Sequence, residues 1–160
     1  MAFPVPVNQF AQFLCDAKRA TYASQEEDAK VKPIFSGSHQ LEFRQGALLY
    51  RDLYYGGDFF AGLETVTFKE KPIWAMSYAG GINESLEPGQ HPGIYDFLGA
   101  ALREVPASAP FRGPETFEAG DFRYTNRILG EVHRFSGVET IYAQDHPVYQ
   151  LHYNGGMIKE

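Results

Sequence analysis

The feature that most constrains the fold is a sequence segment that occurs twice. Residues 60–81 read FAGLETVTFKEKPIWAMSYAGG, and residues 135–156 read FSGVETIYAQDHPVYQLHYNGG. Aligned without a gap, the two segments share Phe, Gly, Glu, Thr, Pro and Tyr at corresponding places and end in the same Gly-Gly pair. A repeat of this kind predicts that one structural unit is built twice within the chain.

The match extends towards the N-terminus in a weaker form. Residues 41–57 align with residues 115–131 after deletion of one residue, and a helical pattern, FLCDAKR or FLGAALR, precedes each stretch. We therefore expect residues 1–160 to form a single domain that contains two repeat units, residues 8–81 and 91–156.

Each unit is predicted to begin with a helix that is buried on one side. In the first unit, apolar residues within 10–17 recur at the i, i+3, i+4, i+7 spacing, and Asn8 is the expected N-cap. In the second unit, residues 94–105 have the same period and end at Pro106. Both helices should therefore face the core.

After each helix come four stretches with strand character, separated by turns such as Gln45-Gly46 and Ala119-Gly120. Short connections force antiparallel pairing, because a parallel return needs a crossover of about a dozen residues. We predict an α+β protein: a tandem duplication of an α-β-β-β-β unit that forms an antiparallel sheet or a partly closed eight-stranded barrel with two helices. The Gly-Gly pairs at 56–57, 80–81 and 155–156 are interpreted as turns.

Composition excludes several classes of function. The net charge of −6 argues against direct binding of nucleic acid, which needs clustered Lys and Arg. The five His residues have no metal-ligand spacing, so we expect no metal and no cofactor. Cys15 lies in the first helical pattern and is expected to be a buried thiol. No apolar run reaches the ~18 residues of a membrane span, and we expect a cytoplasmic protein without a membrane partner.

Strand alternation places an acidic side chain on an apolar face in each unit. Glu64 shares one strand face with Phe60 and Val66, and Glu139 holds the matching position in the second unit. Carboxylates among aromatic rings suit a cationic or hydrogen-bond-donating small molecule. The predicted ligand-binding residues are Tyr50, Asp52, Tyr54, Glu64, Trp74, Tyr78, Glu139, Tyr149 and Tyr153.

A structural role for the two glutamates remains open. Gly62 and Gly137 could introduce bulges that reverse the alternation and place both carboxylates in solvent or on Arg51 or Arg134. A carboxylate kept in both units could equally hold a turn by accepting backbone N–H bonds.

A family resemblance covers nearly the whole chain. The stretches FLCDAKRATYAS, GALLYRDLYYGGDFFAGLETV, KPIWAMSYAGG, PFRGPE and VYQLHYNGG resemble a bacterial family of unknown function. Members of that family occur alone or fused C-terminal to a Cro/XRE-type helix-turn-helix. The resemblance implies association with transcription regulators and a sensing role, although we expect no helix-turn-helix in this chain.

Three functions follow from these observations. The leading prediction is a small-molecule-binding, sensor-like domain with an aromatic, acid-containing cavity. The alternative is an interaction or scaffold protein whose exposed aromatic side chains form a homodimer surface. An enzyme that uses Glu64 or Glu139 as an acid or base comes third, and we favour a protein without catalysis.

Overall fold

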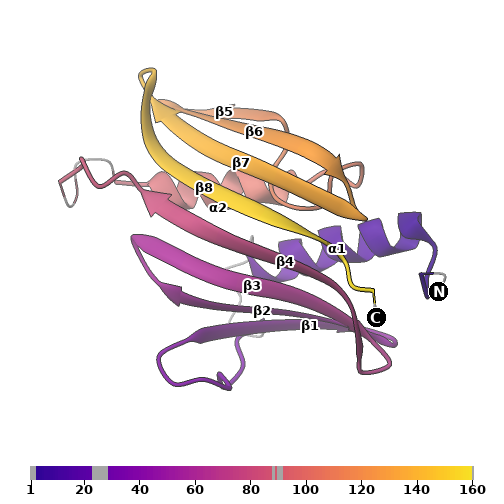
Figure 1. Cartoon of the computed structure of the whole chain (residues 1–160). Helices are drawn as coiled ribbons and strands as arrows, with labels where there is room; N and C mark the ends of the chain where they lie inside the picture. Colours follow the sequence, from indigo (N-terminus) through magenta and orange to yellow (C-terminus); the bar gives the residue numbers. More distant parts are fainter. Residues whose placement is uncertain (1–2, 23–28, 88, 90–91, 160) are drawn as a thin grey trace.

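A computed structural model of the chain describes residues 3–22, 29–87, 89 and 92–159. The expected start of the second repeat unit, residue 91, lies outside the described residues. Within them, α1 (Val7–Thr21) and α2 (Ile94–Arg103) lie on one side of a single antiparallel sheet, as Figure 1 shows.

The sheet has eight strands in the order β1-β2-β3-β4-β8-β7-β6-β5. These strands are β1 (His39–Gln45), β2 (Leu48–Gly56), β3 (Phe59–Phe68), β4 (Lys71–Ile82), β5 (Thr116–Ala119), β6 (Phe122–Glu131), β7 (Arg134–Ala143) and β8 (His146–Met157). The predicted α+β class and antiparallel sheet are confirmed.

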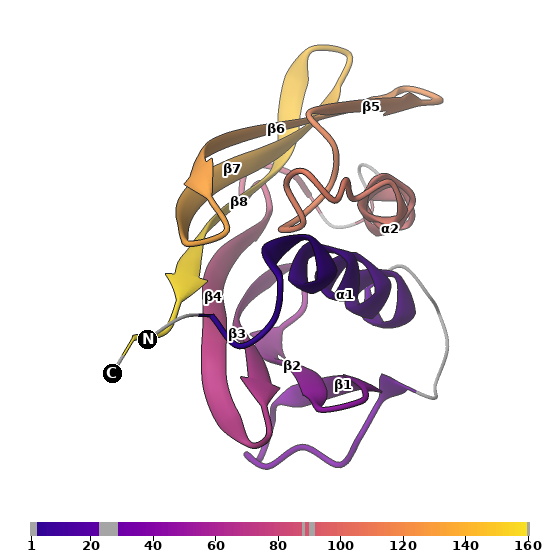
Figure 2. The same ribbon diagram turned by 90° about the vertical axis from the view of Figure 1, so that its right-hand side faces the viewer.

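The partly closed barrel is wrong, because β1 and β5 lie at opposite edges of an open sheet. Figure 2 shows the reason: the sheet curves around both helices, which fill its concave side and keep the two edges apart.

Two groups of elements meet along the β4–β8 pair. We call α1 with β1–β4 the first half and α2 with β5–β8 the second half. In the β4–β8 register Tyr78 lies opposite Tyr153.

Gly80 also lies within the β4–β8 pairing, where an added Cβ would collide with the backbone of Gln150. The interpretation of residues 80–81 and 155–156 as turns is therefore wrong, because both pairs lie inside long strands.

The helices bury the predicted apolar faces. Phe10, Phe13, Leu14 and Ala17 of α1 are all buried, and α2 buries its own apolar stripe. The N-cap prediction is wrong: α1 begins at Val7, and Pro6, not Asn8, is the cap residue. The fixed φ of proline suits this non-helical position, although proline has no side-chain acceptor to offer.

Hairpins connect the strands within each half. The β3–β4 and β7–β8 connections are two-residue turns, Lys69-Glu70 and Gln144-Asp145, and all four residues have positive φ. This is the geometry of a type I′ turn, which matches the twist of paired strands.

The predicted burial of Cys15 is confirmed. Its thiol is buried and lies 3.8 Å from the carbonyl oxygen of Val105, to which it donates. Burial raises the pKa of this thiol, an effect that Arg19 and Lys18 partly oppose. No helix in the described part of the chain is long and apolar enough to cross a membrane.

Candidate functional site

The concave face of the sheet carries two buried carboxylate centres. Glu64 and Glu139 are both fully buried on this face, as strand alternation predicts. The bulge alternative is wrong, because the pairing of β3 and β7 with their neighbours is regular at Gly62 and Gly137.

Aromatic rings explain why glycine is needed at these two positions. Gly62 lies opposite Tyr78, and an added Cβ would overlap the tyrosine ring. The same holds for Gly137 and Tyr153. Each glycine therefore lets a tyrosine lie flat across the strand and direct its hydroxyl towards the neighbouring strand.

The first-half centre is built around Glu64. Lys18 of α1 donates to Oε2 of Glu64 at 2.6 Å, and the hydroxyl of Tyr22 donates to Oε1 at 2.9 Å. Burial lowers the pKa of Lys18, whereas the charge of Glu64 opposes this change. Lys18 thus sits on the buried face of α1, one turn beyond Leu14.

Asp52 lies beside this ion pair. It is opposite Glu64 in the β2–β3 register, and its Oδ1 accepts a hydrogen bond from the hydroxyl of Tyr78 at 2.7 Å. Its other oxygen, Oδ2, has no hydrogen-bond partner among the described residues. Burial, and then the neighbouring charge of Glu64, raise the pKa of Asp52 to about 7.

The second-half centre is built around Glu139 and is more completely bonded. Arg112 forms a bidentate ion pair with the carboxylate: Nη2 donates to Oε1 at 2.6 Å and Nε donates to Oε2 at 3.1 Å. The hydroxyls of Tyr124 and Tyr149 each donate to it at 2.7 Å. Burial alone would lower the pKa of Arg112, but the charge of Glu139 outweighs it and holds that pKa well above the ordinary value.

Asn126 occupies the place in the second half that Asp52 has in the first. Its Oδ1 accepts from the hydroxyl of Tyr153 at 2.7 Å, and its Nδ2 donates to the carbonyl of Gly113 at 3.0 Å. Both ends of the amide are therefore satisfied without a charge.

Four buried polar groups lack a hydrogen-bond partner in the described part of the chain. Three belong to the first half: the Tyr50 hydroxyl, Oδ2 of Asp52 and Nε1 of Trp74. The fourth is Nη1 of Arg112. Unpaired buried polar groups are rare in folded proteins, and three of these four lie in the first half.

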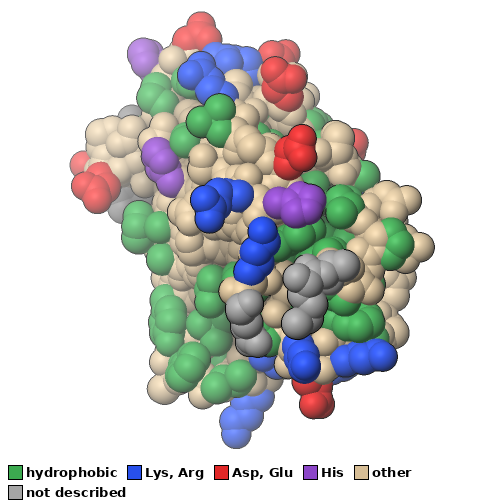
Figure 3. Space-filling model, turned by 45° about the vertical axis from the view of Figure 1, so that its right-hand side comes forward, with side chains coloured by type: hydrophobic (Ala, Val, Ile, Leu, Met, Phe, Trp, Pro, Cys, Tyr) green, Lys and Arg blue, Asp and Glu red, His purple; other side chains and the backbone are tan. Residues whose placement is uncertain are grey.

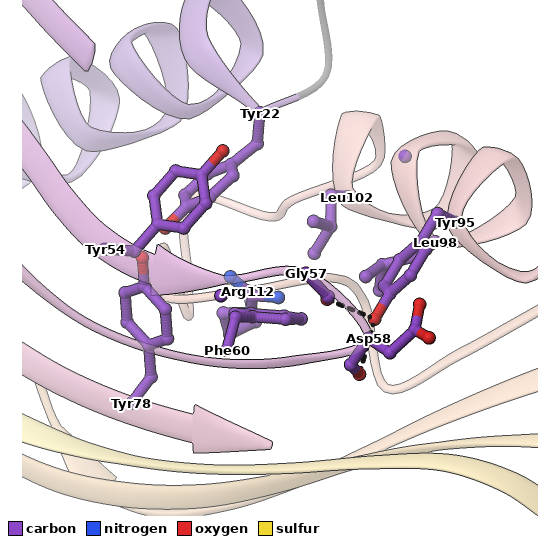
Figure 4. A pocket seen from close by; sticks show the side chains of 12 residues that line it. Tyr22, Tyr54, Gly57, Asp58, Phe60, Tyr78, Tyr95, Leu98, Leu102 and Arg112 are labelled. Carbon is purple, nitrogen blue, oxygen red and sulfur yellow. Dashed lines mark hydrogen bonds between the residues drawn. The ribbon is translucent and has the colours of Figure 1, made fainter. Parts of the chain in front are cut away.

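A pocket of about 470 Å³ opens next to this region, between the β2–β3 hairpin and α2 (Figure 4). Its lining is mostly aromatic and aliphatic. The lining residues are Tyr22, Tyr54, Gly56, Gly57, Asp58, Phe60, Tyr78, Tyr95, Leu98, Gly99, Leu102 and Arg112.

Arg112 links the two centres through this pocket. Its guanidinium lies over the ring of Tyr22 at 5.1 Å and 5.8 Å from the ring centroid of Tyr78. The cation of the second-half centre therefore forms part of a pocket wall whose other polar groups come largely from the first half.

Tyr95 fastens α2 to the β2–β3 turn on the opposite side of the pocket. Its hydroxyl contacts the carbonyl oxygens of Gly57 at 2.9 Å and Asp58 at 2.8 Å. Figure 4 shows Tyr22, Tyr54 and Tyr78 facing Tyr95, Leu98 and Leu102 across the pocket, with Arg112 and Phe60 between them.

The predicted ligand-binding residues are distributed unevenly around the pocket. Tyr54 and Tyr78 line it, and Asp52 is one hydrogen bond behind Tyr78. Tyr50 and Glu64 lie deeper in the same half, whereas Glu139, Tyr149 and Tyr153 belong to the second-half core. As ligand contacts, all nine remain predictions.

Trp74 lies away from the pocket. Its ring stacks on Phe135 and contacts the edge of Phe10, and it does not appear in the lining. Through these contacts Trp74 packs in the core between α1 and the sheet.

Sequence reasoning missed Lys18, Tyr22, Arg112 and the α2 side of the pocket. A signal for Lys18 was present, because it continues the apolar stripe of α1 at i+4 from Leu14. A signal for Arg112 was also present: PIFSGS and APFRGP resemble each other, and Arg112 stands where the first copy has Ser36. A buried cation opposite a buried glutamate could be inferred from such a difference.

No group of three or more His, Cys, Asp or Glu side chains in the described residues is arranged to hold a metal ion. The polar groups of the pocket are instead one guanidinium, one aspartate at the β2–β3 turn and several phenols. Their chemistry is that of hydrogen bonding.

Comparison with known proteins identifies the family to which the chain belongs. A family model described as a domain of unknown function, DUF5680, matches residues 52–158, from the middle of β2 to the end of β8. No curated protein and no solved structure matches the chain. Because the family match spans more than half of the sequence, the protein belongs to the DUF5680 family.

Proposed function

We propose that this protein is a small-molecule-binding, sensor-like domain and that the pocket between the β2–β3 hairpin and α2 is its binding site. The observation that carries the proposal is the side chain of Arg112. It is 1 % exposed, it lines the pocket, and its Nη1 has no partner among the described residues.

The size and lining of the pocket support binding of a small ligand. Its volume of about 470 Å³ is in the ordinary range for small-molecule sites, ~300–1,000 Å³. Aromatic walls with a few polar groups are also typical of such sites. Tyr78 and Arg112 are held by hydrogen bonds to Asp52 and Glu139, so the polar groups are positioned before a ligand arrives.

The enzymatic alternative has less support. It requires Glu64 or Glu139 to meet a substrate, but neither residue lines the pocket. Glu139 already accepts two bonds from Arg112 and two from tyrosines. Burial and nearby carboxylates raise the pKa of the Tyr22 and Tyr78 hydroxyls, so these groups stay protonated at neutral pH.

Three wider inferences accompany the proposal. The pairing of Tyr78 with Tyr153, which occupy the same place in the two copies of the repeat, supports duplication of one ancestral unit about a pseudo-twofold axis. A sensing role in transcriptional regulation and a cytoplasmic location rest on the sequence resemblance and composition alone.

The homodimeric scaffold is the second candidate, and exposed hydrophobic side chains favour it. Phe59, Leu63 and Leu129 are 63 %, 47 % and 76 % exposed. On the face shown in Figure 3, however, hydrophobic side chains form several groups with charged side chains between them. Analytical ultracentrifugation at micromolar concentration separates the two candidates, since a monomer would contradict the scaffold.

Filling the pocket from α2 tests the binding function. Gly99 lines the pocket, and an added Cβ there meets no atom within 4 Å. A Gly99→Leu variant should therefore fold normally, because leucine is also the better helix former. A fragment library is screened by thermal shift, where a ligand at 100 times its Kd adds ~2.7 kcal/mol of stability.

The expected result is that fragments which stabilise the native chain no longer stabilise Gly99→Leu. Ala100→Leu, the neighbouring position on α2 outside the pocket lining, is the matched control and should keep them. Fragments that bind Gly99→Leu as well as the native chain, or a library without a single stabilising fragment, would contradict the proposal.

A further inference from the structure

The guanidinium of Arg112, a residue of the pocket lining, is fixed in direction. Nε and Nη2 are both bound to Glu139, which locks the plane of the guanidinium and leaves Nη1 as the unpartnered nitrogen. Because the planar fork cannot turn without breaking the ion pair, the two N–H groups of Nη1 keep fixed directions in the guanidinium plane. A ligand acceptor in one of these directions would satisfy a buried donor that is costly to leave unpaired.

The neighbouring phenols offer acceptors and not donors. The hydroxyl of Tyr22 already donates to Glu64, and that of Tyr78 already donates to Asp52. Each hydroxyl oxygen still has lone pairs for an incoming N–H group. Both rings lie within 6 Å of the Arg112 guanidinium, so one donor and two acceptors are grouped on the same pocket wall.

The charges around this wall argue against a charged ligand. Lys18 is paired with Glu64, and Arg112 is paired with Glu139, so neither cation is surplus. An anionic ligand would meet a guanidinium whose charge Glu139 already balances. It would also lie near the Asp52 carboxyl, which is hydrogen-bonded to Tyr78. A cationic ligand could meet Asp58 at the β2–β3 turn, but it would share the pocket with the guanidinium. Either charge would also lose its hydration on entry.

The remaining walls fit a flat ring. Phe60 lies against Tyr54 on one side and Tyr95 on the other, with ring centroids 6.4 Å and 6.2 Å away. Leu98 and Leu102 of α2 complete the apolar part of the lining, as Figure 4 shows. Planar ligands gain most from such surfaces because aromatic rings pack on them without a loss of rotamer freedom.

We propose that the pocket selects an uncharged aromatic ligand bearing a carboxamide or lactam group, whose carbonyl accepts from Nη1 of Arg112 and whose N–H donates to the hydroxyl oxygen of Tyr22 or Tyr78. This inference rests on the proposed binding function and adds the chemical class of the ligand. An amide edge supplies the acceptor and the donor side by side, with no net charge.

Three probes that share one ring test the inference: benzamide, benzoate and benzylammonium. Binding to the full chain is measured by ligand-observed NMR titration. Because each head group differs only in charge and hydrogen-bonding pattern, benzamide should bind about tenfold more tightly than the other two.

Two variants test which side chains form hydrogen bonds with the amide group of the ligand. Arg112→Lys keeps a cation beside Glu139 and removes Nη1, and Tyr22→Phe keeps the ring and removes the acceptor. Each should weaken benzamide binding about tenfold and change benzoate binding by less than about threefold. Tyr22 is half-buried at the end of α1, so Tyr22→Phe tests the inference even if Arg112→Lys fails to fold. Thermal unfolding checks both variants.

The possible results distinguish failure of the amide assignment from failure of the proposed binding function. If the three probes bind with affinities within threefold, or benzoate binds most tightly, the amide assignment is overturned and the pocket remains a binding site. If no probe binds at the highest soluble concentration and Gly99→Leu affects no fragment, both proposals fail.

Discussion

The two halves of the molecule bury the same glutamate in different ways. Glu139 accepts four hydrogen bonds, from Arg112, Tyr124 and Tyr149. Glu64 accepts two, from Lys18 and Tyr22. Where the second half has Tyr149 as a donor, the first half has Trp74, whose Nε1 is unpartnered.

This difference separates a carboxylate with four hydrogen bonds from one with two, although both are fully buried. In the second half the Glu139 carboxylate is fully hydrogen-bonded, since a bidentate arginine and two phenols donate to it. The first half retains unpaired polar groups beside a pocket. We expect the second-half centre to contribute more to stability than the first-half centre, and the following substitutions test that division.

The largest effect is expected from neutralising the second-half glutamate. Glu139→Gln leaves the Arg112 guanidinium buried without its counter-ion, which costs about 3–5 kcal/mol. Glu64→Gln should cost less, about 1–3 kcal/mol, because the pKa of Lys18 is already lowered by burial and this amine can release its proton. Urea unfolding of the two variants at the same pH measures the difference, and a larger loss for Glu64→Gln would refute the division.

The next effect concerns pH and compares Asp52 with Asn126. The pKa of Asp52 rises from 3.8 to about 7 on folding, so the folded chain holds this proton more tightly than the unfolded chain. This contribution to stability is complete below about pH 4 and is lost as the pH rises to about 7, a change of about 4 kcal/mol at 1.36 kcal/mol per pKa unit.

Asp52→Asn should remove this pH dependence and make the protein more stable than the native chain at pH 8. The reciprocal change, Asn126→Asp, should introduce a similar loss of stability with rising pH in the second half. Both are measured as free energies of unfolding between pH 4 and pH 8. An unchanged slope in Asp52→Asn would show that this carboxyl is not the titrating group.

A smaller effect is expected at the glycines beneath the paired tyrosines. Gly62→Ala and Gly137→Ala each place a methyl group against a tyrosine ring, and overpacking of this kind costs about 1–3 kcal/mol. The two losses of stability should be similar. Only Gly62→Ala should weaken fragment binding, because Tyr78 lines the pocket and Tyr153 does not. Equal effects on binding would place the site elsewhere.

The smallest effect is expected at the two-residue turns. Replacing Lys69-Glu70 or Gln144-Asp145 by Asn-Gly relieves positive φ at non-glycine residues and should stabilise the protein by about 1 kcal/mol in each case. The second turn also loses an exposed Arg123–Asp145 pair at 3.4 Å, which contributes little. Thermal unfolding should therefore show nearly equal gains, and a loss at either turn would contradict the assignment of strain.

Repetition and strand alternation predicted the parts of this protein that depend on local sequence. The inward direction of Glu64 and Glu139, the hairpins and the buried helix faces all follow from periods of two and 3.6 residues. Closure of the sheet could not be predicted in this way, because it depends on how far the helices hold the edges apart. The N-cap of α1 also escaped prediction, since Pro6 displaced the polar Asn8.

The site was less predictable than the fold because its residues come from separate elements. Tyr54 and Tyr78 could be placed on an inward face from their own strands. The approach of Arg112 and of α2 to that face depends on tertiary packing, to which no local period points. The pairing of a cation with its glutamate is an example, since Lys18 lies on α1 and its partner Glu64 lies on β3, 46 residues later.

The β4–β8 pairing has a consequence for how the chain folds. Every other neighbouring pair of strands in the sheet is a hairpin, so its contacts are close in sequence. Joining β4 to β8 instead closes a long loop, and the entropy of that closure must be overcome before its hydrogen bonds form. We therefore expect the two four-stranded meanders to form first, and their pairing at Tyr78 and Tyr153 to be the slow step of folding.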